Sequence, residues 1–219
     1  MLIAEAKWIA KQLFLHSEEV FPLLIVGSST AKFRKTEQPW IDEYIYKPIS
    51  SKNFKVINSD IKSSEGVDVV FDYNNPDIKN EFVKLEFKSV LCSNVLEHLS
   101  NKEEFCKLIT SIIPEGNYII VTCPYKYPYH PDPIDNKYRP TVEELARLFP
   151  YTKLVKGEII TCRNYLYYLK INLQKLLRVF VRILFPFYNP RGWLIVIGYL
   201  KYLFTNFKVT CIVLKKCNH

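Results

Sequence analysis

The first 160 residues contain five short runs of β-branched and aliphatic residues, each ending in polar or turn-forming side chains. The runs cover residues 23–27, 54–60, 67–72, 88–94 and 117–124. Apolar runs of this length, bounded by turn signals, are typical of strands buried in a core. The pattern therefore predicts five strands in this part of the chain.

Helical signals lie between these runs. Asn101 precedes residues 102–113, whose apolar side chains recur on one helical face, and Pro114 ends the run. Thr141 is followed three residues later by Glu144, which is the capping-box arrangement at the start of a helix. Strands that alternate with helices indicate an α/β fold, in which helices cover both faces of a mostly parallel sheet.

Two more strands complete the expected sheet. Residues 151–162 and 206–217 have the composition of strands, whereas residues 163–205 between them have a helical pattern. We therefore predict a Rossmann-like sheet of seven strands with a helical insertion before the last one. The α/β domain comprises residues 1–162 and 206–219, and the amphipathic helical insertion comprises residues 163–205.

The composition indicates a globular protein of a reducing compartment. The chain has 219 residues, of which 48% are hydrophobic, and this is enough to form an ordinary core. Its six cysteines include no C-x-x-C pair, and His98 and His130 lack zinc-type spacing, so no metal site is expected. Glu5 and Lys7 interrupt the apolar N-terminal stretch, which argues against a signal peptide and favours a cytoplasmic location.

The basic excess of the protein is confined to its last part. Residues 1–158 carry 20 Lys and Arg against 22 Asp and Glu, whereas residues 159–219 carry 10 basic residues and no acid. Residues 163–185 read as one amphipathic helix with a cationic side and an aliphatic side. Such a helix fits the headgroup region of an anionic membrane, so we expect peripheral contact with its inner face.

Three other roles fit the same insertion. It would also serve as a homodimer interface or as a lid over a crevice, because helices packed in a core show the same amphipathic pattern. Nucleic acid is a third candidate for a cationic segment, but the continuous supply of Leu, Ile, Val and Phe argues against it.

Polar side chains follow the carboxyl ends of the five predicted strands. The residues and segments at these ends are Gly27, Asp60, Asp72, residues 93–98 and residues 124–135. In a parallel sheet these ends lie along one edge, and ligands bind in the crevice beyond it. A simpler interpretation remains for Glu97 and His98, which would merely begin a helix, with Glu97 favouring its positive end and His98 pointing to solvent.

The segments "VLCSNVLEHL" (residues 90–99) and "IIPEGNYIIVTCP" (residues 112–124) resemble the class I S-adenosylmethionine-dependent methyltransferases, in the group with a Leu-Glu-His signature. The loop "PYHPDPIDNKYRPT" (residues 128–141) is similar to the loop that follows the fifth strand in members of surface-glycan and lipid-linked pathways. The resemblance covers residues 23–150. It implies S-adenosylmethionine as cofactor and methyl transfer to a small-molecule, glycan or lipid-linked acceptor.

The resemblance also implies roles for the strand-end residues. Asp60 would accept hydrogen bonds from the ribose hydroxyls, and Asp72 or Tyr73 would contact the adenine. The residues expected beside the methionine part are Ser93, Asn94, Glu97 and His98. The residues expected at its carboxylate are Gly27, Ser28 and Ser29, although Ile25 stands where the family carries an acid.

The loop after the fifth strand is expected to lie over the methyl donor. His130 is the first candidate for the base that takes a proton from the acceptor, because its ordinary pKa is near neutral, and Asp132 is the second. Asp135, Tyr138 and Arg139 are expected to contact the acceptor. In the alternative, Asp132, Asp135 and Arg139 hold the loop together through ion pairs.

Methyl transfer to an acceptor at a membrane surface is therefore the function that the sequence favours. A non-catalytic binding module with the same fold is one alternative, suggested by the reduced glycine loop at Gly27. An RNA methyltransferase is another, suggested by the charge of the insertion alone.

Overall fold

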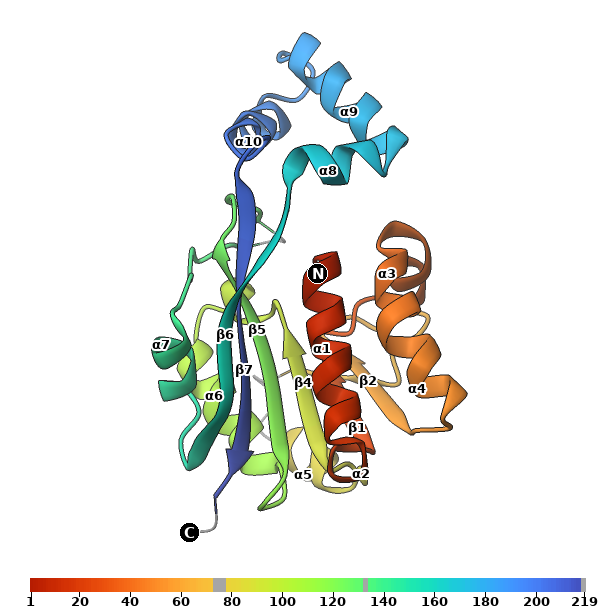
Figure 1. Ribbon diagram of the computed structural model, residues 1–219, viewed down its shortest axis with the longest axis vertical. Helices are drawn as coiled ribbons and strands as arrows, with labels where there is room; N and C mark the ends of the chain where they lie inside the picture. The colour runs from red at the N-terminus through yellow and green to blue at the C-terminus, as the bar shows by residue number, and fades with distance from the viewer. Residues whose placement is uncertain (73–77, 132–133, 218–219) are drawn as a thin grey trace.

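The computed structural model describes residues 1–72, 78–131 and 134–217. Seven strands form one sheet in the order β3-β2-β1-β4-β5-β7-β6 (Figure 1). The strands are β1 (Leu23–Val26), β2 (Val56–Asp60), β3 (Val69–Val70), β4 (Ser89–Ser93), β5 (Tyr118–Lys126), β6 (Thr152–Asn164) and β7 (Asn206–Lys216). Strands β1 to β5 pair in parallel, and β7 runs antiparallel to both β5 and β6. The predicted sheet of seven mostly parallel strands is confirmed.

Helices cover both faces of the sheet. The elements before β2 are α1 (Ile3–Leu15), α2 (Ser17–Val20), η1 (Phe33–Glu37), α3 (Pro39–Ile41), η2 (Asp42–Tyr46) and α4 (Lys47–Ser51). Those between β3 and β6 are α5 (Ile78–Val83), η3 (Leu96–His98), α6 (Lys102–Ile112) and α7 (Val142–Arg147). Those between β6 and β7 are α8 (Tyr165–Lys170), α9 (Leu173–Leu184) and α10 (Pro190–Leu200). In Figure 1, α6 and α7 lie on the other side of the sheet from α1.

Alternation along the strands divides the core into two layers. Leu23 and Ile25 of β1 pack into the cluster that contains α1, whereas Leu24 and Val26 pack into the cluster that contains α6. Successive side chains of a strand point to opposite faces, so a continuous apolar run is what a strand needs when helices cover both faces. Asn101 caps α6 and Thr141 forms the capping box of α7, as the sequence predicts.

The insertion differs from its prediction in one respect. Residues 163–185 are not one helix, because α8 ends at Lys170 and α9 starts at Leu173. Asn172 lies at the break, and its carbonyl oxygen accepts the first helical hydrogen bond of α9 from the Leu176 amide. Asparagine favours this position over a helix interior. Helices α8, α9 and α10 extend beyond the sheet at one end of the molecule (Figure 1).

Candidate active site

A cavity of about 1200 Å³ opens at the carboxyl edge of the sheet. Four parallel strands contribute to it through Gly27 after β1, Asp60 in β2, Asn94 after β4 and Pro124 in β5, and the antiparallel β7 also lines it. Helices also supply walls, and their residues include Glu5 of α1, Tyr168 of α8 and Tyr199 of α10. The insertion therefore lines the same cavity as the strand ends.

The loop after β1 requires its single glycine. Gly27 has a φ of +71°, and a Cβ atom on it would lie 2.5 Å from Cγ2 of Val95, so other residues are excluded on two grounds. Ser29 is also in the left-handed region, with a φ of 58°. Residues held in such conformations cluster at ligand sites.

A buried arginine supports this loop in place of further glycines. Nη1 of Arg34 donates to the carbonyl oxygens of Ser28 (3.1 Å) and Ser29 (2.9 Å), and Nη2 donates to that of Gly66 (2.9 Å). Its residue exposure is 6%. Sequence reasoning missed Arg34, because its partners are loop carbonyl oxygens that carry no sequence signal.

Asp60 lies on the cavity wall with spare hydrogen-bonding capacity. Its Oδ2 accepts a hydrogen bond from the Ser29 amide (2.9 Å), and its Oδ1 accepts one from the Lys62 amide (3.3 Å). Each carboxylate oxygen has two lone pairs, so both oxygens retain capacity for a ligand hydroxyl. The sequence places Asp60 at the sheet edge, and the structure brings it next to the Gly27 turn.

Glu5 is a buried site residue that sequence reasoning missed. It comes from α1, is 1% exposed, and its Oε1 accepts hydrogen bonds from Ser93 Oγ (3.1 Å), Asn94 Nδ2 (2.7 Å) and Thr122 Oγ1 (2.6 Å). A usable signal was present, because Glu5 precedes buried Ile9 by one helical turn and so interrupts the apolar stripe of α1. This carboxylate joins α1 to the carboxyl ends of β4 and β5.

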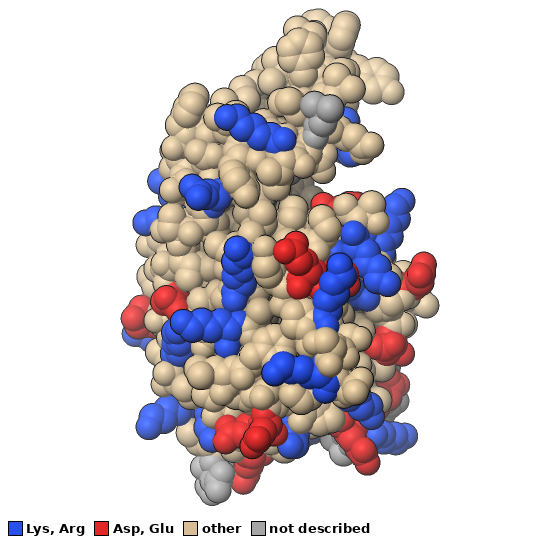
Figure 2. All heavy atoms as spheres, turned by 45° about the vertical axis from the view of Figure 1, so that its right-hand side comes forward, with Lys and Arg blue, Asp and Glu red and all other residues tan. Residues whose placement is uncertain are grey.

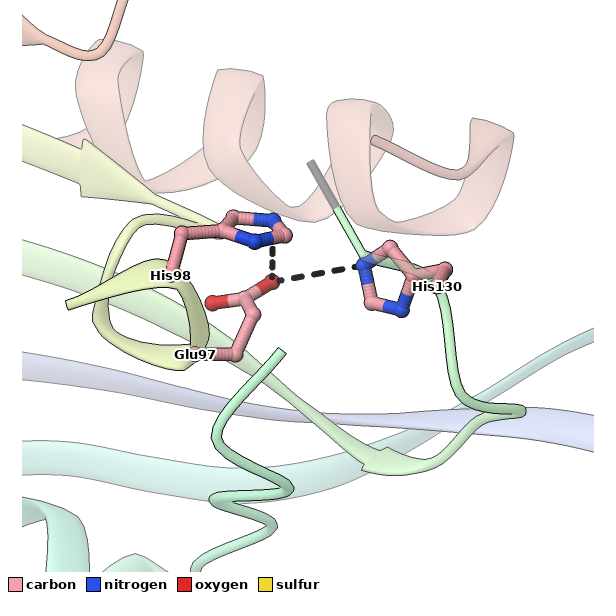
Figure 3. Close-up of side chains that lie close together, drawn as sticks. All are labelled: Glu97, His98 and His130. Atoms are coloured by element: carbon pink, nitrogen blue, oxygen red, sulfur yellow. Dashed lines mark ion pairs between the residues drawn. The ribbon is translucent and has the colours of Figure 1, made fainter. Parts of the chain in front are cut away.

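Glu97, His98 and His130 point toward one another at the edge of the cavity (Figure 3). Oε1 of Glu97 lies 3.8 Å from Nε2 of His98 and 4.0 Å from Nε2 of His130. The Glu97 side chain is fully buried, and burial raises its pKa to about 8. Burial also lowers the pKa of His130, so this imidazole is neutral at pH 7. Both histidines line the cavity.

The loop that carries His130 is tied down by Asp135. This carboxylate accepts hydrogen bonds from the amides of His130 (2.9 Å) and Lys137 (2.8 Å), and it pairs with Arg139 at 2.8 Å. Burial alone would raise the pKa of Asp135, but the hydrogen bonds from Arg139 and from the two amides outweigh burial and lower it to about 2. Asp135 and Arg139 therefore hold the loop, as the alternative interpretation of the sequence expects.

Asn136 joins the same loop to the turn at η3. Its Nδ2 donates to the carbonyl oxygens of Leu96 (2.8 Å) and Leu99 (2.7 Å), and its amide donates to the carbonyl oxygen of Glu97 (2.9 Å). These three bonds set the position of His130 relative to Glu97 and His98. Sequence reasoning missed Asn136, since an asparagine among prolines reads as an ordinary turn residue.

Comparison with solved structures shows which known proteins have the same fold. SpnF, a [4+2]-cyclase, superposes with a TM-score of 0.56 at 16% identity, over 96% of this chain and 81% of the cyclase. Coclaurine N-methyltransferase, bound to N-methylheliamine and SAH, superposes with a TM-score of 0.58 at 12% identity, over 96% of this chain and 70% of the enzyme. The chain has the Rossmann-like methyltransferase fold.

A third structure agrees, and sequence comparison adds nothing further. A protein from Galdieria sulphuraria described as a candidate sarcosine dimethylglycine methyltransferase gives a TM-score of 0.52 at 10% identity, over 98% of this chain and 86% of that protein. No protein-family model and no curated protein matches the sequence. At these identities the likeness establishes the methyltransferase fold, which the resemblance of "VLCSNVLEHL" to known methyltransferases predicts.

Within the methyltransferase fold, most of the predicted cofactor residues lie together. The cavity is lined by Gly27, Ser28, Ser29, Asp60, Ser93, Asn94 and His98. Glu97 lies directly behind His98 and is fully buried. In the simpler interpretation His98 points to solvent, whereas in the structure it lines the cavity beside the buried Glu97.

Six other predicted residues are placed elsewhere or lie outside the described part. Asp72 is exposed and is not among the cavity residues. Asp135, Tyr138 and Arg139 do not line the cavity either, since Asp135 and Arg139 pair with each other and the Tyr138 ring stacks under Lys102. The structure thus does not place these three on the cavity wall. Tyr73 and Asp132 lie outside the described residues.

Proposed function

We propose that the protein is an S-adenosylmethionine-dependent methyltransferase. The observation that carries this proposal is the joint placement of Asp60 and the left-handed Gly27 turn on one cavity wall. An acid at the end of β2 has two oxygens for two ribose hydroxyls, and a side-chain-free turn lets a ligand approach the backbone closely. Coclaurine N-methyltransferase, of the same fold, is bound to SAH.

The cavity has room for a second molecule beside the cofactor. Its volume of about 1200 Å³ exceeds the range of about 300 to 1,000 Å³ that is usual for one drug-sized ligand. We propose that the acceptor binds next to His130, whose imidazole is neutral at pH 7 and so can accept a proton. The acceptor oxygen or nitrogen then takes the methyl group from the sulfonium, and His130 takes the proton that the acceptor loses.

Binding of S-adenosylhomocysteine, measured by calorimetry, tests the proposal directly. Asp60→Ala should weaken this binding by about 1 to 3 kcal/mol, or about 5- to 150-fold, because two ribose hydroxyls lose a charged acceptor. Glu65→Ala is a matched control, since it removes an exposed acid five residues away that is not among the cavity residues.

Two results would contradict this assignment. If Asp60→Ala and Glu65→Ala both bound like the native protein, the ribose would lie elsewhere. If the native protein itself failed to bind S-adenosylhomocysteine, the non-catalytic binding module would replace the enzyme as the proposed function.

We also propose that the insertion rests on an anionic membrane and that the acceptor is a glycan or lipid-linked molecule presented there. Apolar side chains of α9 and the following loop are exposed, with Phe187 at 94% and Tyr188 at 92% exposure. Leu177, Phe180 and Phe185 are also exposed in this segment, and Phe204 is exposed after α10. Figure 2 shows the insertion as a mostly uncharged surface with scattered basic side chains. Exposed aromatic and basic side chains without acids complement anionic headgroups.

The location of the insertion links this surface to the chemistry. Tyr165, Tyr168 and Tyr199 of the insertion line the cavity, so a headgroup held at α9 would lie close to the cavity entrance. No helix in the described residues is long and apolar enough to span a bilayer, so the proposed contact is with the membrane surface.

Sedimentation with lipid vesicles tests the membrane proposal. Native protein should bind vesicles that contain phosphatidylglycerol better than vesicles of phosphatidylcholine alone, and added salt should weaken the binding. The triple variant Lys170→Glu, Arg178→Glu and Arg182→Glu should lower vesicle binding by about 100-fold or more, at roughly 1 kcal/mol for each basic residue.

A second triple variant controls for net charge. Lys84, Lys107 and Lys153 are exposed and lie outside the insertion, so their replacement by glutamate changes the total charge equally. This control should bind vesicles like the native protein. If both triple variants bound alike, or if the native protein ignored anionic lipid, the membrane proposal would be wrong. A change of sedimentation mass in the first variant alone would point to a dimer interface.

A further inference from the structure

Three side chains from two separate segments each direct a potential metal-binding atom toward a shared space. Glu97 and His98 come from η3, and His130 comes from the loop 32 residues later. Oε1 of Glu97 and one ring nitrogen of each histidine all lie within 4.8 Å of one another. Figure 3 shows the three side chains converging on the space between them.

The hydrogen bonds of both imidazoles leave the inward-facing nitrogens without a proton. Nδ1 of His98 lies 2.6 Å from the carbonyl oxygen of Ile134, and Nδ1 of His130 lies 3.1 Å from that of Pro128. A carbonyl oxygen only accepts hydrogen bonds, so each Nδ1 carries the proton of a neutral ring. Each Nε2 therefore directs a lone pair toward Glu97.

Glu97 completes the set with an unsatisfied oxygen. Its side chain is fully buried, and in the described part of the chain Oε1 has no hydrogen-bond partner. A buried carboxylate oxygen without a donor is costly, and native proteins usually satisfy it with a proton donor or a cation. The distances to the two Nε2 atoms, 3.8 and 4.0 Å, are too long for hydrogen bonds.

We propose that Glu97, His98 and His130 form a binding site for a transition-metal dication of the zinc type. Two imidazoles and one carboxylate are the ligand set of known catalytic zinc sites. Around a tetrahedral ion with metal–ligand bonds of about 2.0 to 2.2 Å, neighbouring ligand atoms lie about 3.3 Å apart. Oε1 of Glu97 would therefore have to move only about half an ångström closer to each of the two Nε2 atoms.

The surroundings of the three ligands match those of a metal site. Ligating histidines usually donate their other ring N–H to a carbonyl oxygen or carboxylate, which fixes the ring. The carbonyl oxygens of Ile134 and Pro128 are such acceptors here. Nδ1 of His130 has a second acceptor nearby, because Oδ2 of Asp135 lies 3.3 Å from it. Asn136 holds the two ligand-bearing segments together through its bonds to Leu96 and Leu99.

Three protein ligands leave at least one coordination position open. His98 and His130 both line the cavity, so that position faces the space where we place the acceptor. An oxygen that binds there would be polarised and would lose a proton more readily. With the ion bound, Nε2 of His130 is a ligand and no longer the base, so this proton passes to solvent. This last step rests on the proposed methyl transfer, whereas metal binding itself does not.

A titration with Co²⁺ in the absence of cofactor tests the site. The Cys217→Ser protein is the suitable background, since Cys217 is the exposed thiol and the other five cysteines are buried. One Co²⁺ per chain should bind and give the visible absorption of a four- or five-coordinate ion, and Zn²⁺ should displace it. Binding should also raise the melting temperature, because the ion binds the folded state.

Single substitutions then identify the ligands. Glu97→Gln, His98→Ala and His130→Ala should each lower Co²⁺ affinity at least about 100-fold, since loss of an outer partner alone costs 10- to 100-fold. His16→Gln is the matched control, because His16 stacks on Tyr118 away from the cluster. Glu97→Gln keeps the size of the side chain, so it distinguishes loss of a ligand from loss of folding.

Two results would overturn the proposal. One is the absence of a Co²⁺ spectrum at one equivalent, and the other is equal Co²⁺ binding by the native protein and all three ligand variants. Because the titration contains no S-adenosyl compound, a protein that bound Co²⁺ but not S-adenosylhomocysteine would refute the methyltransferase and leave the metal site standing.

Discussion

His130→Ala should lower methyl transfer by about 10²- to 10⁴-fold while S-adenosylhomocysteine affinity stays within a few fold of the native value. General-base catalysis contributes an effect of this size. His130 lines the cavity, while the predicted cofactor contacts lie at the strand ends, so the two functions should separate. The measurement is release of S-adenosylhomocysteine from S-adenosylmethionine with a panel of hydroxyl and amine acceptors, beside calorimetry of cofactor binding.

The pH profile distinguishes a base from a residue that only shapes the loop. Burial lowers the pKa of His130, so the metal-free native enzyme should gain activity as pH rises through a value below the ordinary histidine pKa of 6.5. The alanine variant should lack this limb. Tyr129→Phe is a suitable control on the same loop, because Tyr129 is 50% exposed.

Turnover within a few fold of native in His130→Ala would assign the proton to Asp132 or to solvent. Asp135 would not qualify, since its oxygens are held by Arg139 and by two backbone amides. If Co²⁺ or Zn²⁺ restored activity to the native protein and not to the variant, His130 would act as a metal ligand and not as a free base.

Asp135→Ala should destabilise the protein by about 3 to 5 kcal/mol, the usual cost of removing one partner from a buried ion pair. The Asp135 side chain has no exposed surface, and its loss leaves Arg139 and two amides without their acceptor. For a chain of this length the melting temperature should fall by about 6 to 20 °C. Urea unfolding followed by circular dichroism gives the free energy directly.

Asp135→Asn provides the matched comparison, because it keeps an oxygen for the amides and removes the charge. It should lose less stability than Asp135→Ala. The pKa of Asp135 is lowered to about 2 from 3.8, so its stabilising effect is present above pH 4 and is lost as pH falls through 2. The difference between native protein and Asp135→Ala should therefore shrink in acid. An equal difference at pH 7 and pH 2 would contradict the ion-pair explanation.

The strands and two helices were predictable because their signals are local. Apolar runs located the seven strands, and the caps at Asn101 and Thr141 located α6 and α7. The break at Asn172 also has a local cause, but it was not predicted. The amphipathic pattern continues across the break, and one polar residue does not change the helical period.

The site was predictable where topology places residues and not where distant segments meet. Gly27, Asp60 and Asn94 follow strands, so the parallel order alone brings them to one edge. Glu5 reaches Thr122 across 117 positions of sequence, and Arg34 reaches Gly66 across 32. Contacts between residues so far apart in the sequence leave no periodic pattern from which they could be predicted. The cluster of Glu97, His98 and His130 was unpredictable for a similar reason, because it depends on a loop that Asn136 holds in place.

Because β6 pairs with β7, the insertion between them can be replaced by another segment without a change in the pairing of the two strands. Asn164 and Asn206 are register partners, so the chain enters and leaves α8, α9 and α10 at neighbouring points of the sheet. A short hairpin turn would join the same two strands and keep their pairing, while Tyr165, Tyr168 and Leu169 would be lost from the core layer beside α1. Exchange of this segment would replace Tyr165, Tyr168 and Tyr199 in the cavity wall and leave Gly27 and Asp60 in place. Under the proposed function, acceptor choice and membrane attachment would thus be free to diversify together, while the cofactor end of the cavity stays constant.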